Sequence, residues 1–385
     1  MTADAKKDSQ NSRRRRYAIN TAVVIISTVL TLLLAETGVR LILPQKLITQ
    51  YSKIWRPDSV FGWRHQENVA TLVNSGEGAV HFVTDNEGYR INADGEITRK
   101  ADVEQDYAVL FIGDSFLEAI QVENRLTIPQ VMREALASQY PDANISVTNS
   151  SVGGWNPNHY YLEAQRLSPE RYDLAIVFLY VANDVICEKV QRFPPKQVHV
   201  HKLRFPKQVS SKEFISAILY PINETFERYS HLYVLTKNRT KWLRVKAGLA
   251  PVYFPDIFLT TMRSSACWET TIEVCESIRD EFARHGTTCI FALLPTHYQI
   301  DEHVFNSYVK SLNIDEALVD LEQPNNKLRN LFDSSSLVLV DPLEHMRATA
   351  DKGATLYGSI DSHLNAKGHR VVADYMVPIV KSEIE

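Results

Sequence analysis

Apolar positions change their pattern near residue 107, and this change divides the chain. From residue 46 to 106, short apolar pieces are separated by Asn, Gly and Asp turns, which is typical of small β-strands. From residue 107 on, wholly apolar runs of strand length alternate with helical patterns. The strand runs are 108–112, 145–148, 174–180, 288–294 and 337–340, and the helical patterns are about 126–139, 157–167, 266–284, 314–332 and 366–383. This alternation predicts an α/β domain over residues 107–385, with a parallel sheet covered on both faces.

Two regions fall outside this alternation. The β-rich lead-in at 46–106 shows no candidate chemistry, and we expect it to cover one side of the domain or to hold it near a membrane. The region 186–265 contains Pro194-Pro195, a basic run, and helical pieces near 214–222 and 230–245. It is predicted to be an insertion over the carboxyl edge of the sheet, where a lid facing a ligand would sit. The other interpretation is an insertion that only packs against the domain and has no function. Both interpretations stay open.

The N-terminus combines a charge run with a long apolar stretch. Residues 1–16 are polar and end in four consecutive arginines, and residues 17–35 contain no charged side chain. A stretch of this length matches the roughly 20 residues with which a helix crosses a bilayer. We therefore predict a cytoplasmic basic tail at 1–16 and a transmembrane signal anchor at 17–43. The arginines keep the N-terminus cytoplasmic, so that the rest of the chain is periplasmic or extracellular.

Two alternatives compete with the anchor. A cleavable signal peptide has a shorter apolar region that ends in a small-x-small cleavage site. Here Leu33 stands where a small residue would be needed before Ala35. A buried core helix is the second alternative, but it gives the four arginines no purpose in packing.

Composition narrows the classes of function. The net charge of −4 over 385 residues gives no reason to expect a nucleic-acid partner. Four cysteines are too few and too unevenly spaced for a disulfide scaffold or a zinc cluster, so no metal site is predicted. Cys187 and Cys267 are candidates for a disulfide if the compartment is oxidising, whereas Cys275 and Cys289 are expected to be buried thiols.

The first strand run of the α/β domain ends in Gly113-Asp114-Ser115. This tripeptide places a nucleophilic hydroxyl at the carboxyl edge of the sheet, where open α/β sheets bind their ligands. Ser115 would stand at a helix entrance, where free backbone N–H groups point towards anions. Because the tripeptide also occurs by chance, Ser115 needs partners elsewhere in the chain. Asp114 is expected to be structural and to hold the turn.

A base and an orienting acid are predicted in one short loop before the last helix. His363 lies two residues after Asp361, and in an extended loop both side chains would point the same way. His363 is therefore the candidate base for Ser115, and Asp361 the group that holds its ring. A helix N-cap or a plain surface loop would also explain this Asp-x-His spacing.

Two hydrogen-bond donors follow the second and third strand runs. Gly154 lies in a glycine-containing turn after the second run, and Asn183 comes soon after the third. A backbone N–H at Gly154 and the side-chain amide of Asn183 suit an oxyanion. Because these residues follow successive strands of one parallel sheet, all would lie at one edge. The joint pattern is much more specific than any single member.

Together these motifs make the chain resemble the SGNH (GDSL-like) hydrolase superfamily from roughly residue 105 to the end. The resemblance implies a flavodoxin-like three-layer α/β/α sandwich with a central parallel sheet, the SGNH hydrolase fold. It implies a catalytic triad of Ser115, His363 and Asp361. It also implies an oxyanion hole formed by the backbone N–H groups of Ser115 and Gly154 and the side chain of Asn183.

The lead-in and the anchor resemble the membrane-anchored bacterial branch of that superfamily. The lead-in carries Arg-Pro-Asp at 56–58 and Gly-Trp-Arg at 62–64, as that branch does. Three departures are visible: Val181 stands where the family usually has Gly, Ala119 stands where Gly is frequent, and Asp-x-His is shorter than the common Asp-x-x-His. None of them removes a catalytic group.

The resemblance implies an exported, membrane-anchored serine esterase that cleaves acyl esters, above all acetyl esters, on cell-envelope carbohydrate or lipid. No cofactor is required. An O-acetyltransferase of extracellular or periplasmic polysaccharide uses the same triad. It would need a membrane partner that supplies acyl groups, because one membrane segment does not carry acetyl across. A carbohydrate-binding module on an inactive scaffold is opposed by the intact Ser, His and Asp.

Other residues on the predicted edge are candidates for contacts with substrate. His297, Tyr298 and Gln299 follow the fourth strand run and could line an acyl or glycan pocket, or form a plain loop. Trp155, beside Gly154, could stack on a sugar or pack in the core. The sequence leaves these alternatives open.

Overall fold

The structure is a computed structural model, and it describes residues 3–45, 47, 54–96, 98–99, 106–170, 172–194, 219, 222–247, 255–260, 265–312, 314–358 and 361–384. Contacts divide the chain into two units. The anchor unit consists of Met1–Ile48 and Val209–Arg244, and the sheet unit of Thr49–Gln208 and Val245–Glu385.

Five parallel strands form the centre of the sheet unit. They are β6 (Tyr107–Ile112), β7 (Ile145–Asn149), β8 (Leu174–Tyr180), β9 (Thr288–Leu294) and β10 (Leu339–Val340), in the order β10-β9-β8-β6-β7. Counted along the chain, this is the 2-1-3-4-5 order of flavodoxin-like folds. The predicted fold class is therefore confirmed. Phe111 in β6 is level with Asn149 in β7 and Ile176 in β8, so the carboxyl ends of these strands lie together.

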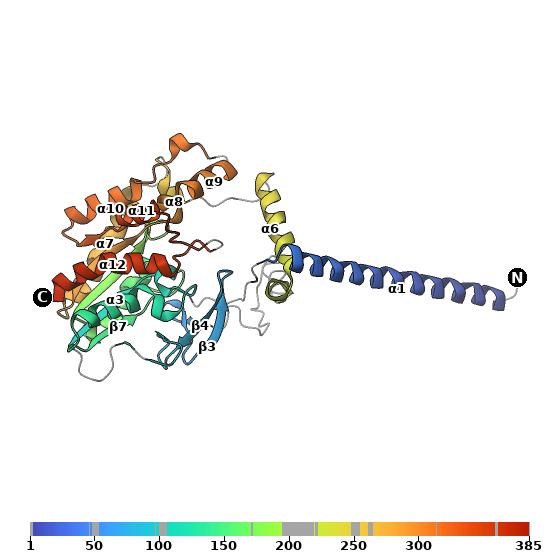
Figure 1. Ribbon diagram of the computed structural model, residues 1–385, viewed down its shortest axis with the longest axis horizontal. Coiled ribbons are helices and arrows are strands. Elements are labelled where there is room, and N and C mark those ends of the chain that lie inside the picture. Colours follow the sequence, from blue (N-terminus) through green and yellow to red (C-terminus); the bar gives the residue numbers. More distant parts are fainter. Residues whose placement is uncertain are drawn as a thin grey trace. The chain divides into compact units, whose positions relative to one another are not determined.

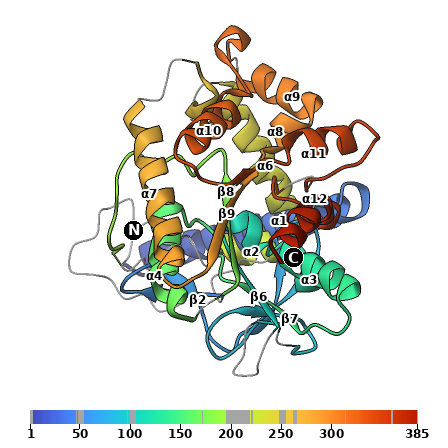
Figure 2. The same cartoon turned by 90° about the vertical axis from the view of Figure 1, so that its left-hand side faces the viewer.

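Helices cover both faces of this sheet (Figure 1). On one face lie α4 (Pro157–Leu167), α7 (Ser265–Ala283) and α10 (Gln323–Ser334), and on the other α3 (Ile128–Gln139), α11 (Leu343–Ala350) and α12 (Ala366–Ile384). Figure 2 shows α4 and α7 on one side of the strands and α3 and α12 on the other. Leu110 belongs to the first core and Phe111 to the second. Because successive side chains of a strand point to opposite faces, wholly apolar strands fill both cores.

The predicted helix at 314–332 is wrong in its first half. A single 3-10 turn (Glu316–Leu318) comes first, and α10 begins only at Gln323. Pro324 explains the difference, since proline suits the first turn of a helix but not its interior. The structure also adds helices that the pattern did not predict, namely α8 (His297–Ile300), α9 (Glu302–Leu312) and α11.

The lead-in forms two small antiparallel sheets. One pairs β1 (Trp55–Asp58) with β2 (Gly62–His65), and the other contains β3 (Ala70–Asn74), β4 (Ala79–Thr84) and β5 (Arg90–Ile91). Ile54, Val73 and Phe82 form a core with Ile120. Ile120 directly follows the short helix α2 (Ser115–Glu118), so the lead-in packs against the segment that carries Ser115.

The anchor unit contains α1 (Ala3–Ile42), which begins inside the predicted tail at 1–16. Its segment Arg15–Ile42 is long and apolar enough to cross a membrane and is not buried by the rest of the chain. Residues 222–229 are helical and are followed by α6 (His231–Lys246), which matches the predicted helical piece at 230–245. The piece near 214–222 and the basic run lie mostly outside the described residues. The lid hypothesis stays a prediction.

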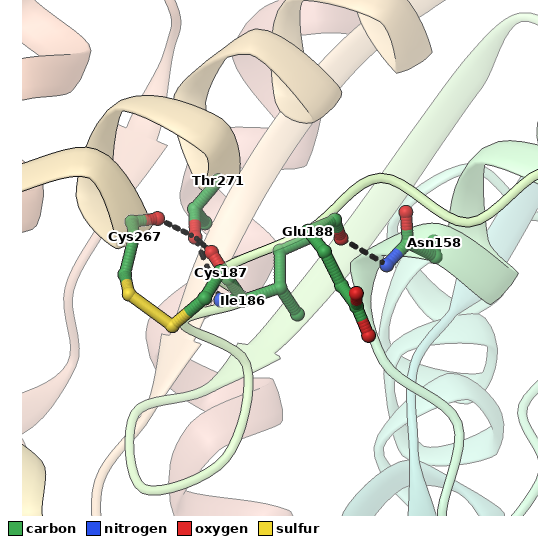
Figure 3. Close-up of a disulfide and its surroundings, with 6 residues drawn as sticks. All are labelled: Asn158, Ile186, Cys187, Glu188, Cys267 and Thr271. Carbon is green, nitrogen blue, oxygen red and sulfur yellow. Dashed lines mark hydrogen bonds between the residues drawn. A yellow bond between two sulfur atoms is a disulfide. The ribbon is translucent and has the colours of Figure 1, made fainter.

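A disulfide joins the two ends of the insertion (Figure 3). Cys187 follows β8 and is bonded to Cys267 in the first turn of α7, 80 residues further along the chain. Thr271 supports this junction, because its hydroxyl accepts the N–H of Ile186 at 2.9 Å and donates to the carbonyl of Cys267 at 2.8 Å. The pairing that the sequence left open is thus present, and the other two cysteines are buried thiols as expected.

Candidate active site

Ser115 lies where β6 turns into α2. Asp114 caps this short helix, since its Oδ1 accepts the N–H of Phe116 at 2.9 Å. Its Oδ2 accepts from the side-chain amide of Asn183 at 3.3 Å. Asp114 is 1% exposed, and this burial raises its pKa to about 6. Asp114 therefore fixes the nucleophile turn and ties it to the end of β8.

Ser115, His363 and Asp361 lie together, although 248 residues separate the first two. His363 Nε2 is 2.7 Å from Ser115 Oγ, and His363 Nδ1 is hydrogen-bonded to Asp361 Oδ1. The helix-cap alternative for Asp361 is not what the structure shows. Asn365 caps α12 instead, by accepting the N–H groups of Lys367 and Gly368.

The contact between His363 and Asp361 sets both of their pKa values. Burial alone would lower the pKa of His363, but the hydrogen bond and the charge of Asp361 outweigh burial and raise it above its ordinary value. Burial alone would raise the pKa of Asp361, but the same contact holds it below its ordinary value. Gln121 Nε2 donates to the second carboxylate oxygen of Asp361 at 3.0 Å. An ionised Asp361 suits an imidazole that gains a positive charge.

The three candidate oxyanion donors follow three adjacent strands. No group in the described part of the chain hydrogen-bonds to the backbone N–H of Ser115 or of Gly154. Gly154 has a φ of 80°, a conformation that favours glycine. Asn183 is exposed just after β8. Among the described residues its amide nitrogen bonds to Asp114 alone, and the amide carries two hydrogens.

Glu118, at the end of α2, is a site residue that sequence reasoning missed. Its side chain is 1% exposed, and its Oε1 accepts from Trp55 Nε1 at 2.9 Å and is 2.6 Å from His65 Nε2. Its Oε2 has no hydrogen-bond partner among the described residues and lies against Gly153, where an added Cβ would approach it to 2.6 Å. Glu118 thus joins the lead-in, the nucleophile helix and the turn that carries Gly154.

Trp63 makes a second contact between the lead-in and the oxyanion turn. Its Nε1 donates to the carbonyl of Gly153 at 2.9 Å, and its ring lies against Gly154, 3.3 Å from where a Cβ would stand. Trp63 and His65 are two residues apart in β2, so they share one face of that strand. The only sequence signal for them was this alternation of a tryptophan and a histidine.

Two further lead-in residues hold the catalytic elements. Arg90, which is 5% exposed, donates to the carbonyls of Glu118, Ala119 and Val122 at the end of α2. Glu77 accepts the backbone N–H of Asp361 at 3.0 Å. The lead-in therefore does more than cover one side of the domain, because its polar side chains contact both the nucleophile turn and the acid loop.

The candidate substrate contacts have different positions. Trp155 is 1% exposed, stacks on Phe61 and lies in the core, so it has no free face for a sugar. Gln299 is 3% exposed and bonds to Thr296 and to neighbouring groups in the core, and Tyr298 is 9% exposed. His297, Tyr298 and Gln299 form α8 rather than an open loop. His297 is half-buried, and burial lowers its pKa.

A pocket of about 460 Å³ lies beside His363, between the β3–β4 turn and the loop that carries Asp361. Apolar atoms make up most of its surface. Polar side chains also line it, namely those of Glu77, Gln121, Glu123, Asp361, His363 and Asn365. Among the described residues, no group of three or more His, Cys, Asp or Glu is placed to hold a metal ion.

No family model matches this sequence, and no curated protein matches it. Solved structures do resemble it. The acetyl xylan esterase AlAXEase is 14% identical with a TM-score of 0.39, over 71% of this chain and 98% of that chain. A lipolytic protein of the G-D-S-L family from Veillonella parvula is 10% identical with a TM-score of 0.37, over 71% and 97%.

A third structure is that of a catalytic mutant of Axe2, an acetylxylan esterase from Geobacillus stearothermophilus. It is 11% identical with a TM-score of 0.38, over 74% of this chain and 96% of that chain. Two of these three structures are acetyl xylan esterases, and one is a lipolytic protein of the G-D-S-L family.

Proposed function

We propose that this protein is a serine ester hydrolase of the SGNH type. The proposal rests on the contacts from Ser115 Oγ through His363 to Asp361, at the carboxyl edge of a sheet with flavodoxin-like strand order. The backbone N–H groups of Ser115 and Gly154 support it, because no described residue accepts a hydrogen bond from them and an oxyanion hole needs available donors.

The proposed chemistry has two halves. His363 takes the proton of Ser115 while Oγ attacks the ester carbonyl, and the oxyanion receives hydrogen bonds from Ser115, Gly154 and Asn183. His363 then gives its proton to the leaving alcohol, and the acyl group remains on Oγ. A water molecule, deprotonated by His363, attacks this acyl-enzyme and releases a carboxylic acid and free Ser115. Loss of one oxyanion donor typically costs about 100–1,000-fold in rate.

The proposed substrate is an acyl ester, above all an acetyl ester, on cell-envelope carbohydrate or lipid. The pocket beside His363 supports this class, since its carboxylates and amide suit hydroxyl groups and its apolar wall suits a ring face or a short acyl chain.

The proposed location is a membrane anchored by 17–43, with the sheet unit outside the cytoplasm. The apolar segment Arg15–Ile42 supports the anchor, and the four arginines ahead of the apolar residues support a cytoplasmic N-terminus. The disulfide between Cys187 and Cys267 supports export, because such bonds persist in oxidising compartments.

The test is acetate release from 4-nitrophenyl acetate by the full-length protein in detergent micelles, with and without an unacetylated oligosaccharide. We expect acetate release in both cases, with a loss of at least about 10⁴-fold in Ser115→Ala. Transfer of acetyl to the oligosaccharide would instead favour an O-acetyltransferase, which would work with an acyl-supplying membrane partner. Full activity in a folded Ser115→Ala variant would contradict the proposal.

A further inference from the structure

The helix α6 begins against the last turns of α1 (Figure 1). The carboxylate of Glu36, near the end of α1, accepts the N–H groups of His231 at 3.0 Å and Leu232 at 2.9 Å, and the hydroxyl of Ser230 at 2.8 Å. These donors belong to the first turn of α6 and the residue before it. Glu36 therefore caps the positive end of α6 from another helix.

Arg40 adds a second tie between the same elements. Its Nε donates to Glu36 at 2.7 Å, and its Nη2 donates to the carbonyl of Tyr229. Farther along, the N–H of Gln45 donates to His231 Nδ1 at 2.7 Å. Residues 222–246 are called the surface segment here. These contacts tie its residues 229–232 to the level where the apolar stretch of α1 ends. For a helix that spans a bilayer, this level is the interface between membrane and water.

The first helix of the surface segment has an exposed apolar stripe. Ile222, Phe226 and Tyr229 are 50%, 47% and 57% exposed, and their spacing of four and three residues places them on one face. Another face is occupied, because Glu227 is buried and pairs with Lys237 of α6. Phe226 also contacts Tyr233 of α6, with ring centres 5.3 Å apart, but about half of its surface stays exposed, as in Ile222 and Tyr229.

Positive charge accompanies this stripe. The sequence of α6 contains no Asp or Glu, and Arg239 and Arg244 are exposed on it. Arg228 is exposed beside Tyr229, with its guanidinium 5.3 Å from the ring centre. An apolar stripe combined with basic side chains is typical of helices that lie in the interface of an anionic membrane.

We propose that the surface segment docks on the anionic surface of the bilayer that α1 crosses, with Ile222, Phe226 and Tyr229 at the level of the headgroups. This inference rests on the proposed anchor and is independent of the esterase chemistry. The proposed occupant is lipid, because the stripe is joined to the end of a helix that exposes large apolar side chains from Tyr17 to Ile42.

The experiment uses the full-length protein in vesicles, with an environment-sensitive fluorophore on single introduced cysteines. Phe226→Cys reports on the stripe, and Glu224→Cys, on the opposite side of the same helix, is the matched control. Leu30→Cys in α1 reports on the anchor alone. The native free thiols are buried, and their background labelling is measured in the unmodified chain.

In vesicles containing anionic phosphatidylglycerol we expect blue-shifted emission at position 226 and quenching by nitroxide-bearing lipids, but little of either at 224. In vesicles of neutral phosphatidylcholine both effects at 226 should weaken, while those at position 30 persist. Equal exposure to water at 226 and 224, with position 30 protected, would overturn the docking and leave the anchor intact. Equal protection at 226 in neutral vesicles would overturn the role of anionic lipid. Exposure at position 30 would overturn the anchor and the docking together.

Discussion

The lead-in and the surface segment both lie outside the α/β alternation, but their contacts differ in kind. The lead-in places Trp63 and His65 against the oxyanion turn and Glu118, and Glu77 against the acid loop. The surface segment bonds instead to Glu36 and Arg40 of α1. In both regions the contacting residues lie far apart in the sequence, so the contacts could not be predicted from sequence separation. The comparison predicts that lead-in variants change kcat, whereas surface-segment variants do not.

The largest effect on activity is expected at the triad. Losses of kcat in variants of the lead-in and of the surface segment are compared with this effect. Asp361→Asn should lower kcat by about 10⁴-fold, because the imidazole loses its tautomer and its counter-charge. In the wild type, kcat/KM should fall as the pH drops and His363 gains a proton, with the midpoint above 6.5 because its pKa is raised.

The pH profile of the Asp361→Asn variant provides the second measurement. Without the carboxylate, the pKa of His363 should decrease, so that the acid limb of the residual activity moves to lower pH. An unchanged limb would contradict the role of Asp361.

Removal of the disulfide tests how much the closed insertion contributes to the free energy of unfolding of the sheet unit. Cys187→Ser should lower the free energy of unfolding by about 2–5 kcal/mol, because the bond closes a long loop in the unfolded chain. Denaturant unfolding measures this loss, with Cys275→Ser as the control for a cysteine outside the bond. A variant as stable as the wild type would show that the bond does not constrain the unfolded chain.

The pair of His65 and Glu118 tests the contribution of the lead-in to catalysis. His65→Gln removes the imidazole that contacts the buried Glu118 carboxylate and leaves Trp55 Nε1 as the donor to Oε1, so that the negative charge beside the nucleophile turn opposes the oxyanion more strongly. We expect kcat to fall about 10–100-fold, which corresponds to about 1.4–2.8 kcal/mol, with KM little changed.

The double variant His65→Gln/Glu118→Gln removes the carboxylate as well, so most of the lost activity should return. Glu118→Gln alone should remain close to the wild type, because the amide oxygen can still accept from Trp55 and His65. If the double variant is less active than His65→Gln, the pair acts only by holding structure, and the electrostatic account is wrong. Melting temperatures of all three variants separate misfolding from catalysis.

A smaller effect is expected for Trp63→Phe. The ring still packs against Gly154, but the hydrogen bond to the carbonyl of Gly153 is lost, so the oxyanion turn loosens without losing its donor. We expect kcat to fall about 3–10-fold, well below the roughly 100–1,000-fold for a deleted donor. Steady-state kinetics check this, and an unchanged kcat would show that the turn holds its shape without Trp63.

The smallest effect on catalysis is expected in the surface segment. Phe226→Ser removes apolar surface that contacts no catalytic residue, so kcat in detergent micelles should equal that of the wild type. The same variant should weaken lipid quenching at a neighbouring labelled position. A clear loss of kcat in micelles would mean that the surface segment takes part in the site, as the lid hypothesis predicts.

The sequence predicted the elements whose signals are local. Wholly apolar runs predicted the strands. Because Ser115, Gly154 and Asn183 each follow a strand run and His363 precedes the last helix, they were predicted to meet at one edge of the sheet. Glu118 and His65 escaped prediction because their pairing depends on how the lead-in folds over α2. Trp155 was ambiguous for the same reason, since an aromatic beside a glycine turn packs inwards or outwards according to its tertiary neighbours.

Covalent labelling of Ser115 tests the central claim most directly. Full-length protein is treated with a fluorophosphonate, and the modified peptide is identified by mass spectrometry. The account predicts a single adduct on Ser115, formed in proportion to the loss of esterase activity and much more slowly in His363→Ala. Complete inactivation with the adduct on another residue, or full activity with Ser115 modified, would contradict it.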